Sequence, residues 1–228
     1  MTSFHRSTVF SCLMFCLAIG AEAQVYDASN DFSIANNPNG VWSYGFTDTL
    51  SSNLILDTVS IADPRGIDAW VGNRAGDGNP SVTHNRTNDP VIVGSVTWLP
   101  NQIILHPGPS GEYSTIRWTV PATGRFTFDA GFIGQDGATT DVHILKNGVS
   151  LFSDSINGYG NAKSYFETLS FETNDLIDIK VGFGGNAFFS DSTGVRARIT
   201  AVPAPGALIT LLIGAVPGAA VLLRRRRK

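Results

Sequence analysis

The stretch RFTFDAGF at residues 125–132 decides the fold class of this chain. Its apolar side chains fall at every second position: Phe126, Phe128, Ala130 and Phe132. Because successive side chains of a β-strand point to opposite faces of the sheet, this alternation predicts a strand with one buried and one solvated face. An amphipathic helix would instead need apolar residues at every third or fourth position.

The same alternation recurs outside this stretch, for example in residues 115–120, 176–183 and 194–200. Turn residues separate the runs, and Asn147-Gly148 is a strong signal for a two-residue hairpin. We expect about ten to twelve strands, at residues 41–46, 53–59, 67–71, 91–98, 102–106, 112–120, 124–133, 141–146, 149–156, 164–171, 176–183 and 194–200. Strands of this kind build two packed sheets, so we predict an all-β jelly-roll β-sandwich, with an up-and-down barrel as the alternative.

One segment departs from this pattern. Residues 74–89, between the predicted strands at 67–71 and 91–98, are polar, rich in glycine and asparagine, and without any hydrophobic period. Such a composition is typical of a connecting segment on the surface. We therefore expect residues 74–89 to form a long exposed loop.

The first 23 residues have the order of a secretory signal peptide. An apolar run at residues 9–19 is too short to span a bilayer, and Ala21 and Ala23 provide an A-x-A cleavage site for signal peptidase. Both cysteines of the chain lie in this segment. The domain that we predict at residues 24–201 would therefore contain no disulfide.

The last 27 residues, 202–228, have the order of a membrane anchor. Residues 206–223 are uncharged, and as a helix they would extend about 27 Å, enough to cross the hydrocarbon layer. Five cations follow at residues 224–228. Because such clusters stay cytoplasmic, we expect this transmembrane helix to hold residues 24–201 outside the inner membrane.

The order of a proline pair, an apolar helix and a terminal arginine cluster resembles the PEP-CTERM sorting tail. The matching residues are Pro203, Pro205, Gly206, Arg224, Arg225, Arg226 and Arg227. The sequence departs from the family at Ala204, where a glutamate is usual. The resemblance implies that an exosortase recognises and removes the tail, which releases the protein to the cell surface or the extracellular matrix. Without that cleavage the protein would stay anchored in the membrane.

Much of the region between the two ends resembles the exported β-sandwich domain of many PEP-CTERM proteins. The stretches that carry this resemblance are NPNGVWSYGF at 37–46, LHPGPSGEYSTIRW at 105–118, TTDVHILKNGVSLF at 139–152 and FFSDSTGVRARIT at 188–200. Such domains look like galactose-binding and carbohydrate-binding jelly rolls. The resemblance therefore implies a role in binding glycan or extracellular matrix.

The charge of residues 24–201 excludes one class of partner. This region contains 10 of the 16 Lys and Arg residues and 18 of the 19 Asp and Glu residues, which leaves a net charge near −8. Proteins that bind DNA or RNA need basic patches to neutralise phosphates. We therefore expect no nucleic-acid partner.

No arrangement of residues in this region indicates catalysis. Glycoside hydrolysis requires two carboxyl groups that flank the scissile bond. The glutamates of residues 24–201 are Glu112, Glu167 and Glu172, and they lack the E-x-D-x-x-E spacing of jelly-roll glucanases. The segment at 108–111 is not a G-x-S-x-G nucleophile elbow, and no phosphate-binding loop is present. We predict a protein that is not an enzyme.

We expect no cofactor, with calcium as the alternative that two segments rich in oxygen ligands suggest. The candidate ligands are Asp136, Thr139, Asp141, Asn186 and Asp191. Calcium prefers carboxylate, amide, hydroxyl and carbonyl oxygens, which the loops of sandwiches supply. Aspartate and asparagine also form turns without any metal, so that interpretation stays open.

Two aromatic residues are candidates for contact with a sugar. Tyr159 and Phe189 lie in segments rich in glycine, asparagine and serine, where an aromatic side chain is more often exposed, whereas Trp118 alternates with polar residues and is expected in the core. Ordinary loop packing is the alternative for both. The function that we expect is a non-catalytic module of the cell surface that binds extracellular polysaccharide or matrix. A purely structural matrix protein and a secreted glycan-processing enzyme are the alternatives.

Overall fold

The computed structural model describes residues 23–73 and 79–203, and residues 23–202 form one compact unit. Ala23 and Pro203 lie at the two ends of the described chain. The rest of the predicted signal peptide, including Ala21, and the tail with Pro205, Gly206 and the arginine cluster lie outside the described residues. Within the described part of the chain, no helix is long and apolar enough to cross a membrane.

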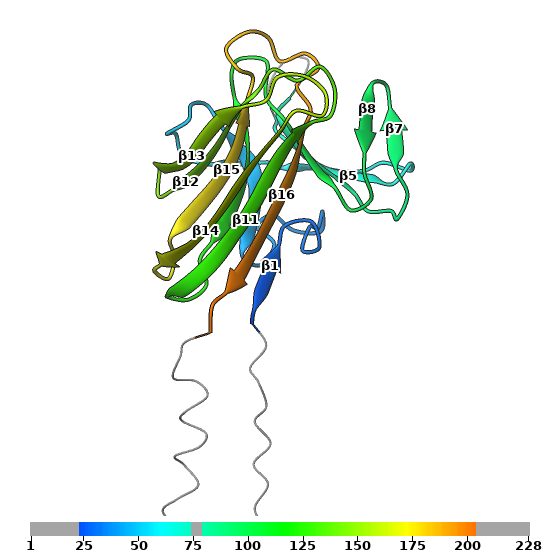
Figure 1. Ribbon diagram of the computed structural model, residues 1–228. Helices are drawn as coiled ribbons and strands as arrows, with labels where there is room; N and C mark the ends of the chain where they lie inside the picture. The colour runs from blue at the N-terminus through cyan, green and yellow to red at the C-terminus, as the bar shows by residue number, and fades with distance from the viewer. Residues whose placement is uncertain (1–22, 74–78, 204–228) are drawn as a thin grey trace, which may run out of the picture. The chain divides into compact units, whose positions relative to one another are not determined.

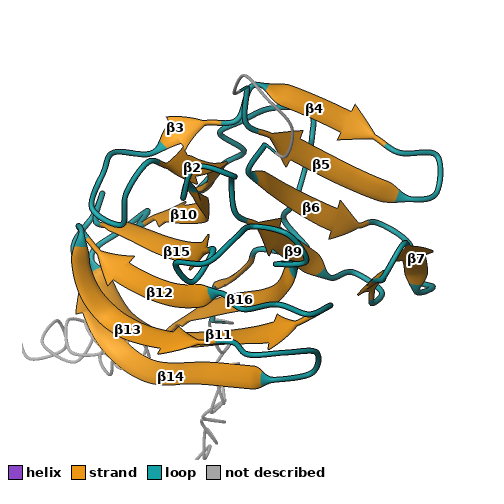
Figure 2. Ribbon diagram, turned by 90° about the horizontal axis from the view of Figure 1, so that it is seen from above, coloured by secondary structure: helices purple, strands orange, loops and turns teal. Residues whose placement is uncertain are grey.

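The unit is all-β, which confirms the predicted all-β class (Figures 1 and 2). The strands are β1 (Val25–Asp27), β2 (Trp42–Thr47), β3 (Ile55–Leu56), β4 (Val59–Ala62), β5 (Ile67–Val71), β6 (Ser81–Asn85), β7 (Val91–Val93), β8 (Val96–Trp98), β9 (Ile103–His106), β10 (Tyr113–Thr119), β11 (Gly124–Gly134), β12 (Asp141–Lys146), β13 (Val149–Ser155), β14 (Ala162–Phe171), β15 (Leu176–Gly182) and β16 (Thr193–Ala201). One main sheet has the order β14-β11-β16-β9-β6-β5-β4, with β1 also paired to β16. The other has the order β13-β12-β15-β10-β2-β3, and β7 and β8 form a separate hairpin.

The last eight strands pair in a nested order. Strand β9 pairs with β16, β10 with β15, β11 with β14, and β12 with β13, all antiparallel. The outermost and third pairs belong to the eight-stranded sheet, and the other two pairs belong to the six-stranded sheet. A long antiparallel ribbon that is rolled across two sheets in this way has the arrangement of a jelly roll.

The inner faces of the two sheets form the core. The inward positions of β11 are almost completely buried, as the alternation predicts: Phe126, Phe128, Ala130 and Phe132. Trp118, on β10 of the other sheet, is fully buried, which confirms its predicted place in the core. Its ring contacts Phe126 at 5.3 Å and Phe171 at 5.9 Å between ring centroids, both with edge-to-face geometry. Such aromatic pairs add about 0.5–1.5 kcal/mol to the stability that burial alone provides.

The prediction of a long exposed loop at residues 74–89 is wrong for its second half. Ser81–Asn85 form β6, which lies between β5 and β9 inside the eight-stranded sheet. Val82 is fully buried there, and so is Asn85, whose Nδ2 donates hydrogen bonds to three carbonyl oxygens. The local pattern does not reveal this strand because Asn85 is a buried polar side chain, and two of its three acceptors, the carbonyl oxygens of Trp98 and Leu99, lie in another part of the chain.

Two other predicted strands are divided in the structure. The expected strand at residues 53–59 is two short strands, β3 and β4, which belong to different sheets. The expected strand at residues 91–98 is the β7–β8 hairpin, in which Gly94 adopts a φ of 62° that favours glycine. The three-residue strand β1 was not expected, because so short a run carries no measurable period.

Asp57 lies at the point where the chain passes from β3 to β4. It is only 2% exposed, and neither carboxylate oxygen has a hydrogen-bond partner among the residues that the structure describes. Burial raises the pKa of Asp57 from 3.8 to about 8. An ionised carboxylate without a partner is costly to bury, so the folded state keeps this group protonated at neutral pH.

This burial predicts a pH dependence of stability that Asp57→Asn should remove. Below about pH 4 the carboxyl is protonated in both states. Between about pH 4 and pH 8 the Asp57 carboxyl is ionised in the unfolded chain but still protonated in the folded chain. The free energy of unfolding therefore falls by up to about 1.4 kcal/mol for each pH unit. Urea unfolding of residues 23–202 at pH 5 and pH 8 should show a smaller difference for Asp57→Asn. The exposed control Asp89→Asn should leave the difference unchanged, and equal slopes for both variants would contradict the assignment.

Candidate functional site

Three loops that carry predicted site residues meet at one end of the sandwich (Figure 1). They connect β11 to β12 (135–140), β13 to β14 (156–161) and β15 to β16 (183–192). Backbone hydrogen bonds join the first loop to the other two, from Gly158 N to Ala138 O at 2.7 Å and from Gln135 N to Ser192 O at 2.9 Å. Gly184 makes the close approach possible, because a Cβ there would lie 2.0 Å from the carbonyl oxygen of Thr139. The three loops therefore form one surface.

Both aromatic residues that we predict to contact a sugar lie exposed on these loops. Tyr159 is 73% exposed, between two glycines with positive φ, and Phe189 is 74% exposed. The Phe189 ring is held by its neighbour Phe188 at 4.3 Å between centroids, and Phe188 in turn meets the ring of His106 edge-on at 6.1 Å. The expectation that both rings are exposed is thus correct, and their contact with a ligand stays a prediction.

Four of the five predicted calcium ligands tie two of these loops together. The backbone N and Oγ1 of Thr139 donate to Asp191 Oδ1 at 2.9 and 3.3 Å. Asn186 Nδ2 donates to Thr139 Oγ1 at 2.6 Å. The backbone N of Ser192 donates to Asp136 Oδ1 at 3.2 Å. The sequence interpretation in which these residues build turns therefore accounts for much of their bonding.

The fifth predicted ligand, Asp141, has other partners. Its Oδ1 accepts a hydrogen bond from the backbone N of Gly184 at 2.9 Å, and its Oδ2 lies 2.8 Å from His143 Nε2. Burial acts to raise the pKa of Asp141, but the hydrogen bonds from His143, Gly184 and Tyr113 outweigh it and the pKa is lowered. Among residues 23–73 and 79–203, no three His, Cys, Asp or Glu side chains are arranged to hold a metal ion.

Asp191 nevertheless retains one feature that fits a cation. It is fully buried, and its Oδ2 has no hydrogen-bond partner in the described part of the chain. Burial raises the pKa of Asp191, and the negative charge of Asp136 raises it further. Burial also raises the pKa of Asp136. Two buried carboxyl groups that destabilise each other's charge would gain from a bound cation, so calcium at this pair stays a prediction.

Calcium binding would appear as a change in melting temperature. We expect residues 23–202 to melt higher in millimolar calcium than in EDTA, by about 2–4 °C for each kcal/mol of stabilisation. Asp191→Asn keeps the oxygen that Thr139 uses and removes the charge, so it should abolish the shift. Asp154→Asn, at a partly exposed carboxylate on β13 outside these loops, should keep it. Identical melting curves of the unsubstituted protein with calcium and with EDTA would dismiss calcium.

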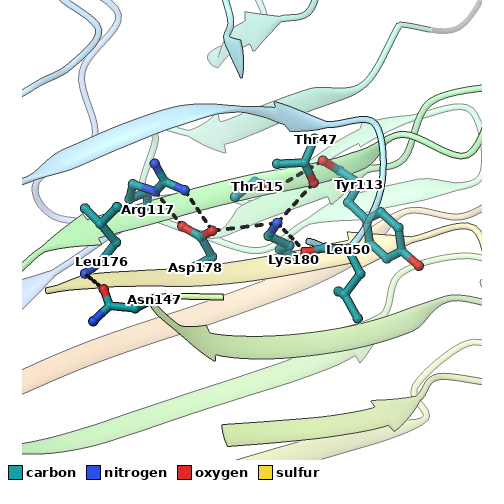
Figure 3. A network of polar contacts seen from close by, with 9 residues as sticks. All are labelled: Thr47, Leu50, Tyr113, Thr115, Arg117, Asn147, Leu176, Asp178 and Lys180. Atoms are coloured by element: carbon teal, nitrogen blue, oxygen red, sulfur yellow. Dashed lines mark hydrogen bonds and ion pairs between the residues drawn. The ribbon is translucent and has the colours of Figure 1, made fainter. Parts of the chain in front are cut away.

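A second polar cluster lies on the outer face of the six-stranded sheet (Figure 3). Arg117 on β10 stands opposite Asp178 on β15, and its Nε and Nη2 donate to the two carboxylate oxygens at 2.6 and 2.9 Å. Lys180 is only 1% exposed, and its Nζ donates to Thr47 Oγ1 at 3.1 Å and to the carbonyl oxygen of Leu50 at 2.9 Å. The same Nζ lies 3.6 Å from Asp178 Oδ2.

The sequence interpretation missed this cluster. The alternation at residues 115–120 and 176–183 predicts solvated positions for Arg117, Asp178 and Lys180. All three do lie on the outer face, but Asp178 and Lys180 are buried there. Residues 48–54 after β2, the covering segment, lie over Lys180, and the carbonyl oxygen of Leu50 accepts a hydrogen bond from its Nζ. No periodicity in the sequence predicts such a covering segment. The only signal was three charged residues at outward positions of two strands whose pairing could not be known.

The cluster forms the floor of a groove of about 270 Å³. Residues 50–53 line one side of this groove, and Asn147, Gly148 and Leu176 line another part. A larger hollow of about 510 Å³ lies over β11, β14 and β16 of the other sheet. Two charged side chains from these strands line the hollow, and both are paired. Lys163 pairs with Asp154, and Arg196 pairs with Asp129. The groove is the better-built polar site because its Asp178 and Lys180 are almost fully buried, whereas the Arg196 side chain over the hollow is 61% exposed.

No family model and no curated protein matches this chain. Solved structures do match it, among them the CBM51 of Clostridium perfringens GH95 in complex with methyl-galactose, at 10% identity over 77% of this chain and 99% of that one, with a TM-score of 0.36. A structure described as "CBM4 structure and function" matches at 11% identity over 62% and 90%, with a TM-score of 0.33. Rabbit GITRL matches at 12% identity over 39% and 73%, with a TM-score of 0.29. These TM-scores are low, so we assign neither a family nor a ligand from them.

Proposed function

We propose that residues 24–201 form a non-catalytic module that binds glycan or extracellular matrix. The observation that carries this proposal is the pair of exposed aromatic rings, Tyr159 and Phe189, on loops that hydrogen bonds fix at one end of the sandwich. Flat aromatic surfaces suit the apolar faces of sugar rings, and nearby polar groups such as Asn186 suit their hydroxyl groups. A soluble folded protein gains little from exposing two such rings without a partner.

A purely structural matrix role is the second candidate, and a separate observation favours it. The edge strands β3 and β4 expose four apolar side chains: Ile55, Leu56, Val59 and Ile61. Edge strands with apolar, uncharged side chains tend to pair with other chains unless they are protected. Side-by-side assembly of copies through these edges would need no small ligand. A secreted glycan-processing enzyme remains as a third outcome of the test.

An array of polysaccharides probed with residues 23–202 would separate the three candidates. We expect binding without release of new reducing ends. Phe189→Ser and Tyr159→Ser should each weaken the binding by about threefold to tenfold, since an aromatic stacking contact provides about 0.5–1.5 kcal/mol.

The matched control for these variants is Phe166→Ser, because Phe166 is 70% exposed on β14, outside the loops. It should bind like the unsubstituted protein. Equal loss in Phe166→Ser and Phe189→Ser would place the binding elsewhere. If no polysaccharide on the array is bound, the structural role is favoured. Release of new reducing ends would establish an enzyme.

We further propose that the module is exported and sorted. The apolar segment of residues 1–23 would direct it to signal peptidase, and the tail at 202–228 would present the helix at 206–223 and the basic end at 224–228 to the membrane and to an exosortase. The support for this proposal is the order of apolar and charged residues at both ends of the sequence. The protein would then lie at the cell surface or in the extracellular matrix.

Mass spectrometry of the protein isolated from its host tests both processing events. We expect an N-terminus at Gln24, because the A-x-A site ends at Ala23. We expect a C-terminus near the proline pair if the tail is removed, or Lys228 in a membrane fraction if it is kept. An intact chain in the cytosol, with Met1 and Lys228 both present, would contradict export.

A further inference from the structure

The groove on the outer face of the six-stranded sheet carries an excess of positive charge. Among the residues that line it, Arg117 and Lys180 are cationic and Asp178 is the one anion. Residues 24–201 as a whole have a net charge near −8. A cationic groove in an acidic module therefore marks a place where an anionic ligand is preferred over the rest of the surface.

The second cation is not needed to neutralise Asp178. Arg117 already pairs with both carboxylate oxygens of Asp178, at 2.6 and 2.9 Å. Lys180 lies farther away, at 3.6 Å, and hydrogen-bonds to neutral oxygens of Thr47 and Leu50. Burial and the nearby charge of Arg117 lower the pKa of Lys180, while Asp178 acts to raise it. A buried cation without a full counter-charge is costly unless a ligand supplies one.

Arg117 also has a free edge, since its Nη1 has no hydrogen-bond partner among the described residues. Its Nε and Nη2 bind Asp178, while in Figure 3 the remaining terminal nitrogen points away from Asp178 and makes no marked contact with the residues drawn. Its side chain is 18% exposed. A guanidinium group held rigidly by one carboxylate is pre-organised to bind a second carboxylate through its other edge.

The walls of the groove supply hydroxyl and amide groups. Ser51 and Asn53 are exposed on the covering segment, and Asn147 stands on the β12–β13 turn. Asn147 itself is engaged, because its Nδ2 donates to Asp175 Oδ1 at 2.7 Å and its Oδ1 accepts from the backbone N of Leu176 at 2.8 Å. Short polar groups beside a cation suit a ligand that carries both hydroxyl groups and a negative charge.

We propose that this groove binds the carboxylate of an acidic sugar, such as a uronic acid unit of a polysaccharide. The carboxylate would lie against the free edge of Arg117, near Lys180, and the sugar hydroxyls would meet the serine and asparagine residues of the covering segment. This inference deepens the proposed function, because it names a class of glycan. The groove is nevertheless separate from the aromatic loops, since Asn147 and Leu176 lie at the ends of β12 and β15 opposite to those loops.

Isothermal titration of residues 23–202 with a galacturonic-acid tetramer tests the proposal, with the fully methyl-esterified tetramer as the neutral counterpart. We expect the acid to bind at least tenfold more tightly than the ester, with an affinity that falls as sodium chloride is raised. Ser51→Trp should fill the groove and weaken the binding at least tenfold. Ser60→Trp, on the exposed strand β4 away from the groove, should leave it unchanged.

Three results would overturn the inference: equal affinity for acid and ester, no binding of either, or unchanged affinity in Ser51→Trp. Circular dichroism of each variant excludes a loss of folding as the cause of weaker binding. Phe189→Ser separates this inference from the proposed function. If the aromatic loops fail to bind neutral glycans but Ser51→Trp still weakens the binding of the acid, the groove assignment holds and only the role of the aromatic loops fails. If neutral glycans bind through Phe189 without a preference for acid, only the groove assignment fails.

Discussion

The packing of two inner sheet faces against each other is the constraint on which the rest of the molecule depends. Trp118 illustrates it, because its ring contacts Phe126 and Phe171 from the opposite sheet. Both cysteines of the chain precede residue 23, so no disulfide supports this contact. Since side chains alternate along a strand, burying Trp118 turns its neighbour Arg117 outward, which places the guanidinium group on the face where the groove lies.

The nested pairing of β9 to β16 determines which loops meet. The connections at 135–140, 156–161 and 183–192 all leave strands at the end where β11 finishes and β12 begins. The turns at 147–148 and 172–175 lie at the other end of the same strands. The jelly-roll order thus gathers distant segments into an aromatic loop surface at one end and leaves the groove toward the other. Both surfaces depend on the register of strand pairing in the two sheets, because a slip of one residue would turn every side chain of a strand to the other face.

Alternation in the sequence was a reliable guide wherever a strand has one apolar and one polar face. It located β11, β15 and β16 because their inward side chains are apolar, and it placed Trp118 in the core. It failed for β6, whose buried Asn85 and His84 look like loop residues until the structure supplies their partners. The candidate calcium ligands came from oxygen-rich composition instead, and the structure gives Asp141 and Asp191 different partners. Asp141 bonds to His143 and to the backbone N of Gly184, and Asp191 bonds to Thr139.

The sequence by itself determined the all-β class, most strand positions, the acidic character of the module and the exposure of Tyr159 and Phe189, because these follow from local period, composition and turn chemistry. Only the tertiary structure decided that Arg117, Asp178 and Lys180 form one cluster and that the segment after β2 covers it. It alone showed that the carboxylate oxygens of Asp57 and one oxygen of Asp191 are buried without hydrogen-bond partners among the described residues. The physical reason is that burial and charge pairing depend on contacts between residues distant in the chain, and the pattern along one strand carries no record of what packs over its outer face.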